Sequence, residues 1–448
     1  MIYQLGYALY GAYTALVYVT PIVGGMIADR YLGYYWASIL GASAMVAGHL
    51  VLGLDNSGLY MGLALIICGY GLFKTNVSCL LGAAYDRRDV RRDSGFALMY
   101  VGGNIGAFIA PILCAWAAQS LGWHYGFLLA AIGMSIGLVI FIAGRSHFEK
   151  GNNPQWQALK SKGLFNFKVL PIIVIGILAA AIFFAVVLFK LFAGWILAIC
   201  VIVSLLLLIS LLFRLQGMDK KSLLAICLFM VFGLIFWSFD QQGGSSISLF
   251  IERNVIKDFL DFHIPAASFQ SINPFAVLIG GVLVSYLWRL LAKMGVRPGA
   301  LVKISFGMVL ITIGFYLIMM GAKIAAASGG HVSMIWVIMG LGIMGVSELF
   351  VDPVALSEIT RLNPGGQVGF LAGVYMLITG AIANYAAAEI AKLTAVDEVK
   401  TAVNFLETSA KSYADVFGGI AAFAAITTVV LIAICITFAI YGRLRGKI

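Results

Sequence analysis

The chain has 448 residues, of which 62% are hydrophobic and only 11% charged, and its mean hydropathy is +1.01. A soluble domain of this size would need far more charge to cover its surface, so the composition excludes a soluble protein. It indicates a polytopic α-helical membrane protein. The net charge of +10 does not indicate nucleic-acid binding, because basic residues of such proteins gather in short cytoplasmic loops.

Long apolar runs recur along the whole chain. A helix needs about 20 mainly apolar residues to cross the hydrocarbon core. On this rule we predict thirteen spans, over residues 4–28, 35–54, 59–84, 94–118, 124–144, 168–189, 192–213, 221–252, 266–292, 299–321, 332–360, 367–391 and 412–441.

The domain organisation follows from the linker at 145–167, which carries an Asn-Pro break and several basic residues. The two spans after it are almost purely apolar, and we expect them to be lipid-facing spacers. We therefore predict an N-terminal bundle at 1–145, a linker and spacer hairpin at 146–220, and a C-terminal bundle at 221–448.

Loop charge predicts the topology. When linkers are placed alternately on the two sides, twenty-one basic residues fall on one side and seven on the other. The positive-inside rule makes the first side, with the C-terminus, cytoplasmic. Thirteen spans then put the N-terminus outside, although transporters of this size usually pair two halves of even helix count. We therefore expect that a first helix is missing from this chain.

Three charged residues lie inside predicted spans: Lys74, Asp240 and Glu348. Each costs about 2.5–3.5 kcal/mol to insert, so each needs a reason. One reading is a polar cavity between the halves, where a Lys–carboxylate pair opens when the acid is protonated or a substrate charge intervenes. The other is a permanent ion pair that only sets helix register. Tyr18, Asn104 and Asn273 lie in the spans as well and favour the cavity.

Signals for other classes of function are missing from the sequence. The six cysteines stand singly in apolar runs without metal-ligand spacing, and we find neither a P-loop nor a nucleophile–base pattern. We therefore expect no enzyme activity, no cofactor and no metal site. Transport would have to draw its energy from an ion gradient.

Several blocks of the sequence resemble the proton-dependent oligopeptide transporter family of the major facilitator superfamily. G-G-M-I-A-D-R-Y-L-G (24–33) resembles its first loop signature, with Asp29 and Arg30, and F-A-L-M-Y-V-G-G-N-I-G-A-F (96–108) its more specific second one. Further similar blocks are G-L-F-K-T-N-V-S (71–78), F-W-S-F-D-Q-Q-G (236–243), F-Q-S-I-N-P (269–274) and S-E-L-F-V-D-P-V (347–354). The likeness covers nearly the whole chain.

The resemblance implies an all-α fold of two six-helix bundles plus a two-helix insertion, here without the first helix. It implies that Lys74 and Glu348 form a charged pair linking the bundles, that Glu348 receives the peptide amino terminus, and that Asp240 serves gating and proton coupling. The cavity residues that it implies are Tyr18, Asn104, Trp237, Asn273 and Tyr375.

The chain departs from the family pattern at three points. The E-x-x-E-R motif of the first helix is not found, Thr75 replaces the usual proline after the lysine, and Tyr375 stands where many members have tryptophan. Without that motif, binding of the peptide carboxylate would depend mainly on Lys74.

We predict a proton-coupled symporter of di- and tripeptides that works by alternating access. We expect it to be a multi-pass monomer of the inner (plasma) membrane, with small peptides, protons and lipid as partners and no nucleic acid. Two alternatives stay open: a symporter of another small polar solute or drug, since fold alone does not set substrate, and a truncated, non-transporting remnant or scaffold.

Overall fold

The computed structural model describes residues 2–54, 58–86, 89, 91–146, 169–190, 193–259, 262–394 and 405–444, which are nearly all helical. In chain order the elements are α1 (Ile2–Ile27), the π-helical η1 (Ala28–Leu32), α2 (Gly33–Leu54), α3 (Leu59–Ala84), α4 (Arg92–Ser120), α5 (Trp123–Ala143), α8 (Val169–Lys190), α9 (Ala193–Arg214), α10 (Gly217–Asp240), the 3-10 helix η3 (Gln241–Gly244), α11 (Ser246–Asn254), β1 (Val255–Ile256), β2 (Asp258–Phe259), β3 (Phe262–His263), the 3-10 helix η4 (Ala266–Ser271), α12 (Ile272–Lys293), α13 (Ala300–Ala327), β4 (Val332–Ser333), α14 (Ile335–Glu348), α15 (Asp352–Leu362), the 3-10 helix η5 (Pro364–Gly366), α16 (Val368–Leu377), the π-helical η6 (Ile378–Ile382), α17 (Ala383–Lys392) and α18 (Phe405–Leu444).

The helices match the predicted spans. Within the described residues, ten helical stretches are long and apolar enough to cross a membrane, and one of them, Ala15–Leu54, covers two predicted spans. The predicted spacer hairpin corresponds to α8 and α9, which contain the shorter apolar stretches Gly176–Val187 and Ala198–Arg214. A helix therefore covers most of every predicted span. The predicted linker lies outside the described residues from position 147 onward.

The chain divides into two compact units. The first unit comprises Met1–Arg92, Ile109–Cys227 and Leu356–Ala381, and the second comprises Asp93–Phe108, Leu228–Ala355 and Ile382–Ile448. Both units contain segments that are far apart in the sequence. The predicted domains, with boundaries at 145 and 220, are consecutive stretches of sequence, whereas these units are groups of segments in contact. The predicted domain division therefore stays a prediction.

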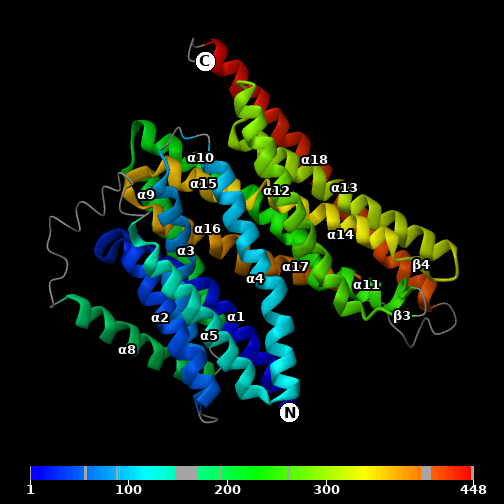
Figure 1. The fold of residues 1–448 in the computed structure, drawn as a ribbon. Coiled ribbons are helices and arrows are strands. Elements are labelled where there is room, and N and C mark those ends of the chain that lie inside the picture. The colour runs from blue at the N-terminus through cyan, green and yellow to red at the C-terminus, as the bar shows by residue number, and fades with distance from the viewer. Residues whose placement is uncertain are drawn as a thin grey trace. The chain divides into compact units, whose positions relative to one another are not determined.

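In the first unit, α1 packs against α3 and α16, and α2 packs against α3 and α5 (Figure 1). Glycines allow the backbones to approach: a Cβ added at Gly24 would collide with the backbone of Gly71, and one added at Gly25 with the backbone of Gly369. Small residues at such crossings are common between membrane helices because they let backbones pack closely. α8 and α9 pack on α3 and α1, respectively.

In the second unit, α13 packs along α18 and α14, and α12 packs on α14 (Figure 1). Aromatic rings fill the space between α11, α13 and α18: Phe417 contacts Phe250 edge-on at a centroid distance of 5.8 Å and Phe315 at 6.1 Å. Two short strand pairs join the loops of this unit, β1 with β4 in parallel and β2 with β3 antiparallel.

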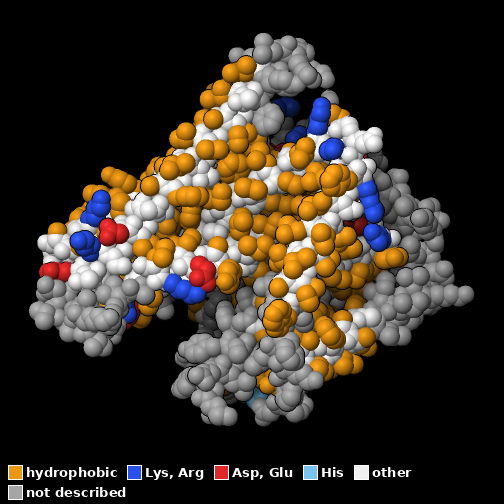
Figure 2. Space-filling model, turned by 180° about the vertical axis from the view of Figure 1, so that it is seen from behind, with side chains coloured by type: hydrophobic (Ala, Val, Ile, Leu, Met, Phe, Trp, Pro, Cys, Tyr) orange, Lys and Arg blue, Asp and Glu red, His pale blue; other side chains and the backbone are white. Residues whose placement is uncertain are grey.

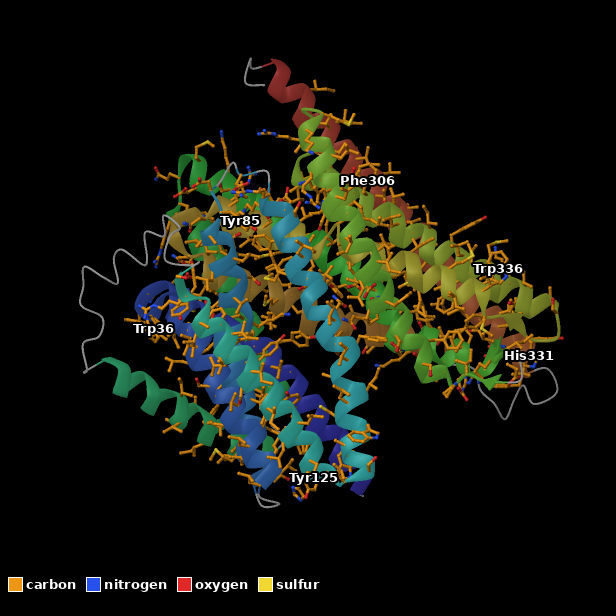
Figure 3. All side chains as sticks on the ribbon, viewed as in Figure 1. Trp36, Tyr85, Tyr125, Phe306, His331 and Trp336 are labelled. Carbon is orange, nitrogen blue, oxygen red and sulfur yellow. The ribbon has the colours of Figure 1, made fainter. Side chains whose placement is uncertain are left out.

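The exposed surface of the helices is apolar. Hydrophobic side chains cover most of the coloured surface in Figure 2, and the few charged ones gather in small groups. Trp36, Tyr85, Tyr125 and Trp336 lie at or near helix ends (Figure 3). Membrane proteins concentrate Trp and Tyr at the lipid–water interface, so both features fit a chain surrounded by lipid.

We expect Asn254→Ala to destabilise the second unit. The Asn254 side chain is fully buried, donates to the carbonyls of Gly330 (2.7 Å) and Leu406 (2.9 Å), and accepts from Ser409 (3.3 Å). Removing it leaves these buried groups without partners, at a cost of about 1–3 kcal/mol. Thermal unfolding in detergent should show a lower midpoint. The exposed Lys392→Ala control, which breaks only a surface pair with Glu389, should change little.

Candidate functional site

Three of the predicted site residues meet in the second unit. The Glu348 carboxylate accepts a hydrogen bond from the Asn273 amide at 2.7 Å on one oxygen and a short hydrogen bond from the Tyr100 hydroxyl on the other. Asp240 lies near the same carboxyl group, close enough for the two acids to interact, and its Oδ1 atom is buried without a hydrogen-bond donor among the described residues. Glu348 and Asp240 are buried, with 5% and 8% of their surface exposed. Four helices, α4, α10, α12 and α14, thus converge on one carboxylate.

Both acids stand at the last residue of a helix that breaks inside its span. α10 ends at Asp240 and continues as the 3-10 helix η3, while α14 ends at Glu348 before α15 begins at Asp352. Pro353 explains the second restart, because proline has no N–H to donate and is tolerated in the first turn of a helix. Both acids therefore stand where the regular helix is interrupted, and the backbone groups freed there need partners from elsewhere in the protein.

The first break is stabilised by the side chain that follows the acid. Gln242 is fully buried, donates to the carbonyl of Ala387 at 3.0 Å and accepts from the Ser246 hydroxyl at 2.6 Å. Freed backbone groups at membrane depth must be satisfied within the protein, and Gln242 joins the broken span to α17. Specific side-chain hydrogen bonds therefore stabilise the interruption of this helix.

Tyr100 is the site residue that we did not predict. It lies within the second signature block, four residues before Asn104, whose amide donates to its carbonyl at 3.1 Å. Residues four apart share one helix face, so this spacing could have identified Tyr100. The reason to choose Tyr100 over other polar residues, its contact with Glu348, depends on packing between helices.

The other two predicted residues of this unit are within four positions of a network residue, Trp237 before Asp240 and Asn104 after Tyr100. Trp237 is one turn before Asp240 in α10, and its ring nitrogen is buried without a hydrogen-bond acceptor among the described residues. Asn104 is half-buried on α4. An indole N–H without an acceptor is a free donor in this part of the span.

A partly buried ion pair holds the start of α4 in the second unit. Asp93 forms a short ion pair with Lys303 of α13, whose ammonium lies 4.7 Å from the Trp288 ring centroid. The next residue, Ser94, donates to the carbonyl of Ser285 at 3.2 Å. These contacts attach the first turn of α4 to α12 and α13.

The remaining predicted residues belong to the first unit. Lys74 is exposed on α3, Tyr18 is half-buried on α1, and Tyr375 is fully buried on α16. Tyr18 packs so closely on Gly380 that an added Cβ there would collide with its ring. The predicted pairing of Lys74 with Glu348 joins residues of different units and stays a prediction.

Asp29 of the first loop signature holds the start of α16. Its carboxylate accepts from the backbone N–H groups of Gly369 and Phe370, each at 3.0 Å, and from the Tyr34 hydroxyl at 2.9 Å. The first N–H groups of a helix have no partner within the helix, so a carboxylate there satisfies them and interacts favourably with the dipole. Arg30 is exposed.

Metal binding has no structural support in the part of the chain that the structure describes, where no group of three or more His, Cys, Asp or Glu side chains is placed to hold an ion.

The sequence and the fold are both similar to those of known transporters. The model of the POT family matches residues 35–408. The peptide transporter YePEPT of Yersinia enterocolitica is 31% identical over 385 residues, covering 82% of this chain and 75% of its own length. The dipeptide and tripeptide permease A of Proteus mirabilis is 30% identical over 398 residues, covering 87% and 79%.

Solved structures of peptide transporters have a fold similar to that of this chain. The crystal structure of a peptide transporter POT in complex with sulfate matches with a TM-score of 0.65 at 26% identity, over 96% of this chain and 86% of that one. Tetrameric PepTSo2 has a similar fold, with a TM-score of 0.66 at 22% identity over 96% and 90%. The predicted fold, that of the major facilitator superfamily, is confirmed. With the match to most of its sequence, this shows that the chain belongs to the POT family.

Proposed function

We propose that the protein is a proton-coupled symporter of di- and tripeptides that works by alternating access. The observation that carries the proposal is the buried network around Glu348, to which Tyr100, Asn273 and Asp240 contribute from three other helices. Ionisable groups inside membrane spans are costly and usually mark the path of a substrate or a proton. The relatives named as peptide transporters support peptides as the substrate.

The network supports a role in proton binding. We expect the two neighbouring carboxyl groups to hold one proton between them, because two ionised carboxylates repel each other and have no hydrogen to share. Tyr100 and Asn273 both donate to Glu348, so they stabilise it as the acceptor and leave the proton on the side of Asp240. Loss of this proton would place two charges together at helix ends, which favours a rearrangement of the broken spans.

The further roles in this proposal follow the family resemblance. Lys74 pairs with Glu348 in one transport state and with the peptide carboxylate in another, and Glu348 receives the peptide amino terminus. The side chains that contact the rest of the peptide are Tyr18, Asn104, Trp237, Asn273 and Tyr375. We further propose that the protein is a monomer in the plasma (inner) membrane, with its C-terminus in the cytoplasm.

The test is uptake of labelled dialanine by proteoliposomes with an imposed inward proton gradient. We expect accumulation that a protonophore removes and that unlabelled di- and tripeptides inhibit. Gradient-driven uptake of another solute, without competition by dialanine, would indicate the alternative substrate class. A folded protein that accumulates neither would contradict the proposal.

A further inference from the structure

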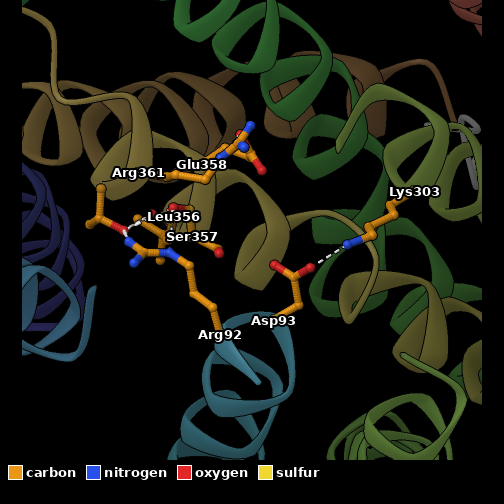
Figure 4. Close-up of polar contacts among 8 residues, drawn as sticks. Arg92, Asp93, Lys303, Leu356, Ser357, Glu358 and Arg361 are labelled. Atoms are coloured by element: carbon orange, nitrogen blue, oxygen red, sulfur yellow. Dashed lines mark hydrogen bonds and ion pairs between the residues drawn. The ribbon is translucent and has the colours of Figure 1, made fainter. Parts of the chain in front are cut away.

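Arg92, the first residue of α4, is almost completely buried, with 3% of its surface exposed. Its guanidinium donates to the carbonyls of Gly82 (2.7 Å) and Tyr85 (3.2 Å) at the end of α3. The same group donates to the Thr360 hydroxyl (2.6 Å) and the Ser357 carbonyl (3.4 Å) of α15 (Figure 4). One side chain thus joins the ends of two helices that are more than 250 positions apart in the sequence.

The chemistry of this contact is that of a charged cap. The last carbonyls of a helix have no partner within the helix and carry the negative end of its dipole, so a cation there is favourable. The planar guanidinium, with five donors, can serve two helix ends at once. Hydrogen bonds from a charged donor are also stronger than neutral ones. The cap therefore favours a state in which α3 and α15 lie together.

Arg92 also stands at the point where the chain passes from the first unit to the second. The chain leaves the first unit directly after Arg92, and the next residue, Asp93, forms its ion pair with Lys303 in the second unit (Figure 4). Movement of α4 relative to α15 therefore has to release the contacts of Arg92. Buried interactions of this kind have two discrete arrangements, made or broken.

A native cysteine reports on whether the contact is closed. On α3, Thr75 contacts the sulfur of Met376 at 3.4 Å, and the backbone at Gly82 abuts the Thr360 side chain. Cys79 is four residues after the first and three before the second, so it lies on the same face of the helix. It is 1% exposed. Cys79 thus lies between the contact of α3 with α16 and its contact with α15, and we expect separation of these helices from α3 to expose it.

We infer that Arg92 is a latch residue that keeps the end of α3 closed against α15, and that its release opens this side of the transporter. The inference rests on the proposed function and on the predicted topology, which places this end of α3 at the cytoplasm. It makes Arg92 a positioning residue, which sets the balance between transport states without touching the peptide.

The experiment measures the rate at which Cys79 reacts with a charged, membrane-impermeant maleimide. The protein carries Cys79 as its only cysteine, in inside-out membrane vesicles that present the cytoplasmic face. We expect Arg92→Ala to raise the rate about tenfold, because one hydrogen bond from a charged donor corresponds to a factor of ten or more in an equilibrium constant. Thr360→Val, which removes one acceptor, should raise it less, and Arg92→Lys should fall between wild type and Arg92→Ala.

Arg91→Ala is the matched control. Arg91 is the neighbouring residue with the same charge, but its side chain is 74% exposed and pairs with Asp89 at 2.8 Å. The hydrogen bond from Arg91 lowers the pKa of the Asp89 carboxyl, so the positive charge of Arg91 acts on a neighbour in the loop. Its loss should leave the reaction of Cys79 unchanged. A protein with Cys68 as its only cysteine, three turns earlier on α3, should show no increase in any variant.

The outcomes separate the latch from the proposed function. An unchanged rate in Arg92→Ala and Thr360→Val would overturn the latch, and so would an equal increase at Cys68, which would indicate general loosening. Should Arg92→Ala fail to fold, Thr360→Val decides alone. Dialanine uptake is measured separately on the wild-type protein: if it is absent while the Cys79 pattern holds, the proposed function fails and the latch stands.

Discussion

Glu348→Gln is expected to abolish proton-driven accumulation of dialanine. The side chain keeps its size, and its single amide oxygen can still accept from Asn273, while an NH2 donor replaces the oxygen that accepts from Tyr100. The amide can no longer gain or lose a proton or balance a positive charge. Without the Glu348 carboxylate, loss of the Asp240 proton no longer places two charges together, so the proton gradient no longer favours one transport state over the other. The ratio of internal to external dialanine should then fall to about one.

The measurement separates coupling from folding. Proteoliposomes preloaded with unlabelled dialanine should still exchange it for labelled dialanine, since exchange needs no net proton movement. Glu358→Gln is the matched control, because this half-buried glutamate on α15 pairs with Arg361 of the same helix at 2.6 Å. We expect it to accumulate dialanine like the wild-type protein. Accumulation by Glu348→Gln at the wild-type level would rule out Glu348 as a coupling group.

The sequence was sufficient to predict the transmembrane architecture. Hydropathy acts over whole spans, so α13 or α18 can be recognised without knowledge of any contact between them. The three charges inside spans were equally visible, because each contrasts with about twenty apolar neighbours. Two of them, Asp240 and Glu348, lie in the second unit, where the structure places them near each other.

The details of the site depended on contacts that no local pattern contains. The short helix η3 after Asp240 is stabilised by the contact of Gln242 with Ala387, which is 145 positions away. The roles of Tyr100 and Arg92 likewise depend on residues more than 240 positions later in the chain. Sequence periodicity reports which face of a helix is apolar, but it does not report which other helix covers that face.

The interleaving of the two units along the chain also results from contacts between residues that are distant in the sequence. Gly25 and Gly369 are brought together because both lack a side chain at one crossing point, and this joins α16 to the first unit. A reading by chain order assigns α16 to the C-terminal bundle. Both divisions can hold for a protein that alternates between states, since a contact such as the Asp29 cap of α16 can be made in one state and broken in another.

Lys74→Ala is expected to reduce dialanine uptake roughly thirtyfold or more, the equivalent of about 2 kcal/mol for removing one member of a charged contact with the bound peptide. Lys74 is the basic residue deepest within a predicted span, and its neighbours Thr75 and Asn76 are fully buried. Lys323→Ala, which removes an exposed lysine near the end of α13, is the matched control and should transport normally. Unchanged uptake by Lys74→Ala would contradict the assignment of Lys74.

The affinity of dialanine for the single and double variants tests whether Lys74 acts together with Glu348. If the two side chains bind the peptide carboxylate and amino group independently, the losses of affinity in Lys74→Ala and Glu348→Gln should multiply in the double variant. If they also pair with each other, each single substitution leaves the other charge without a partner, and the double variant should lose less than the product. Calorimetric titration of the three variants therefore distinguishes a lysine that only binds peptide from one that also pairs with Glu348.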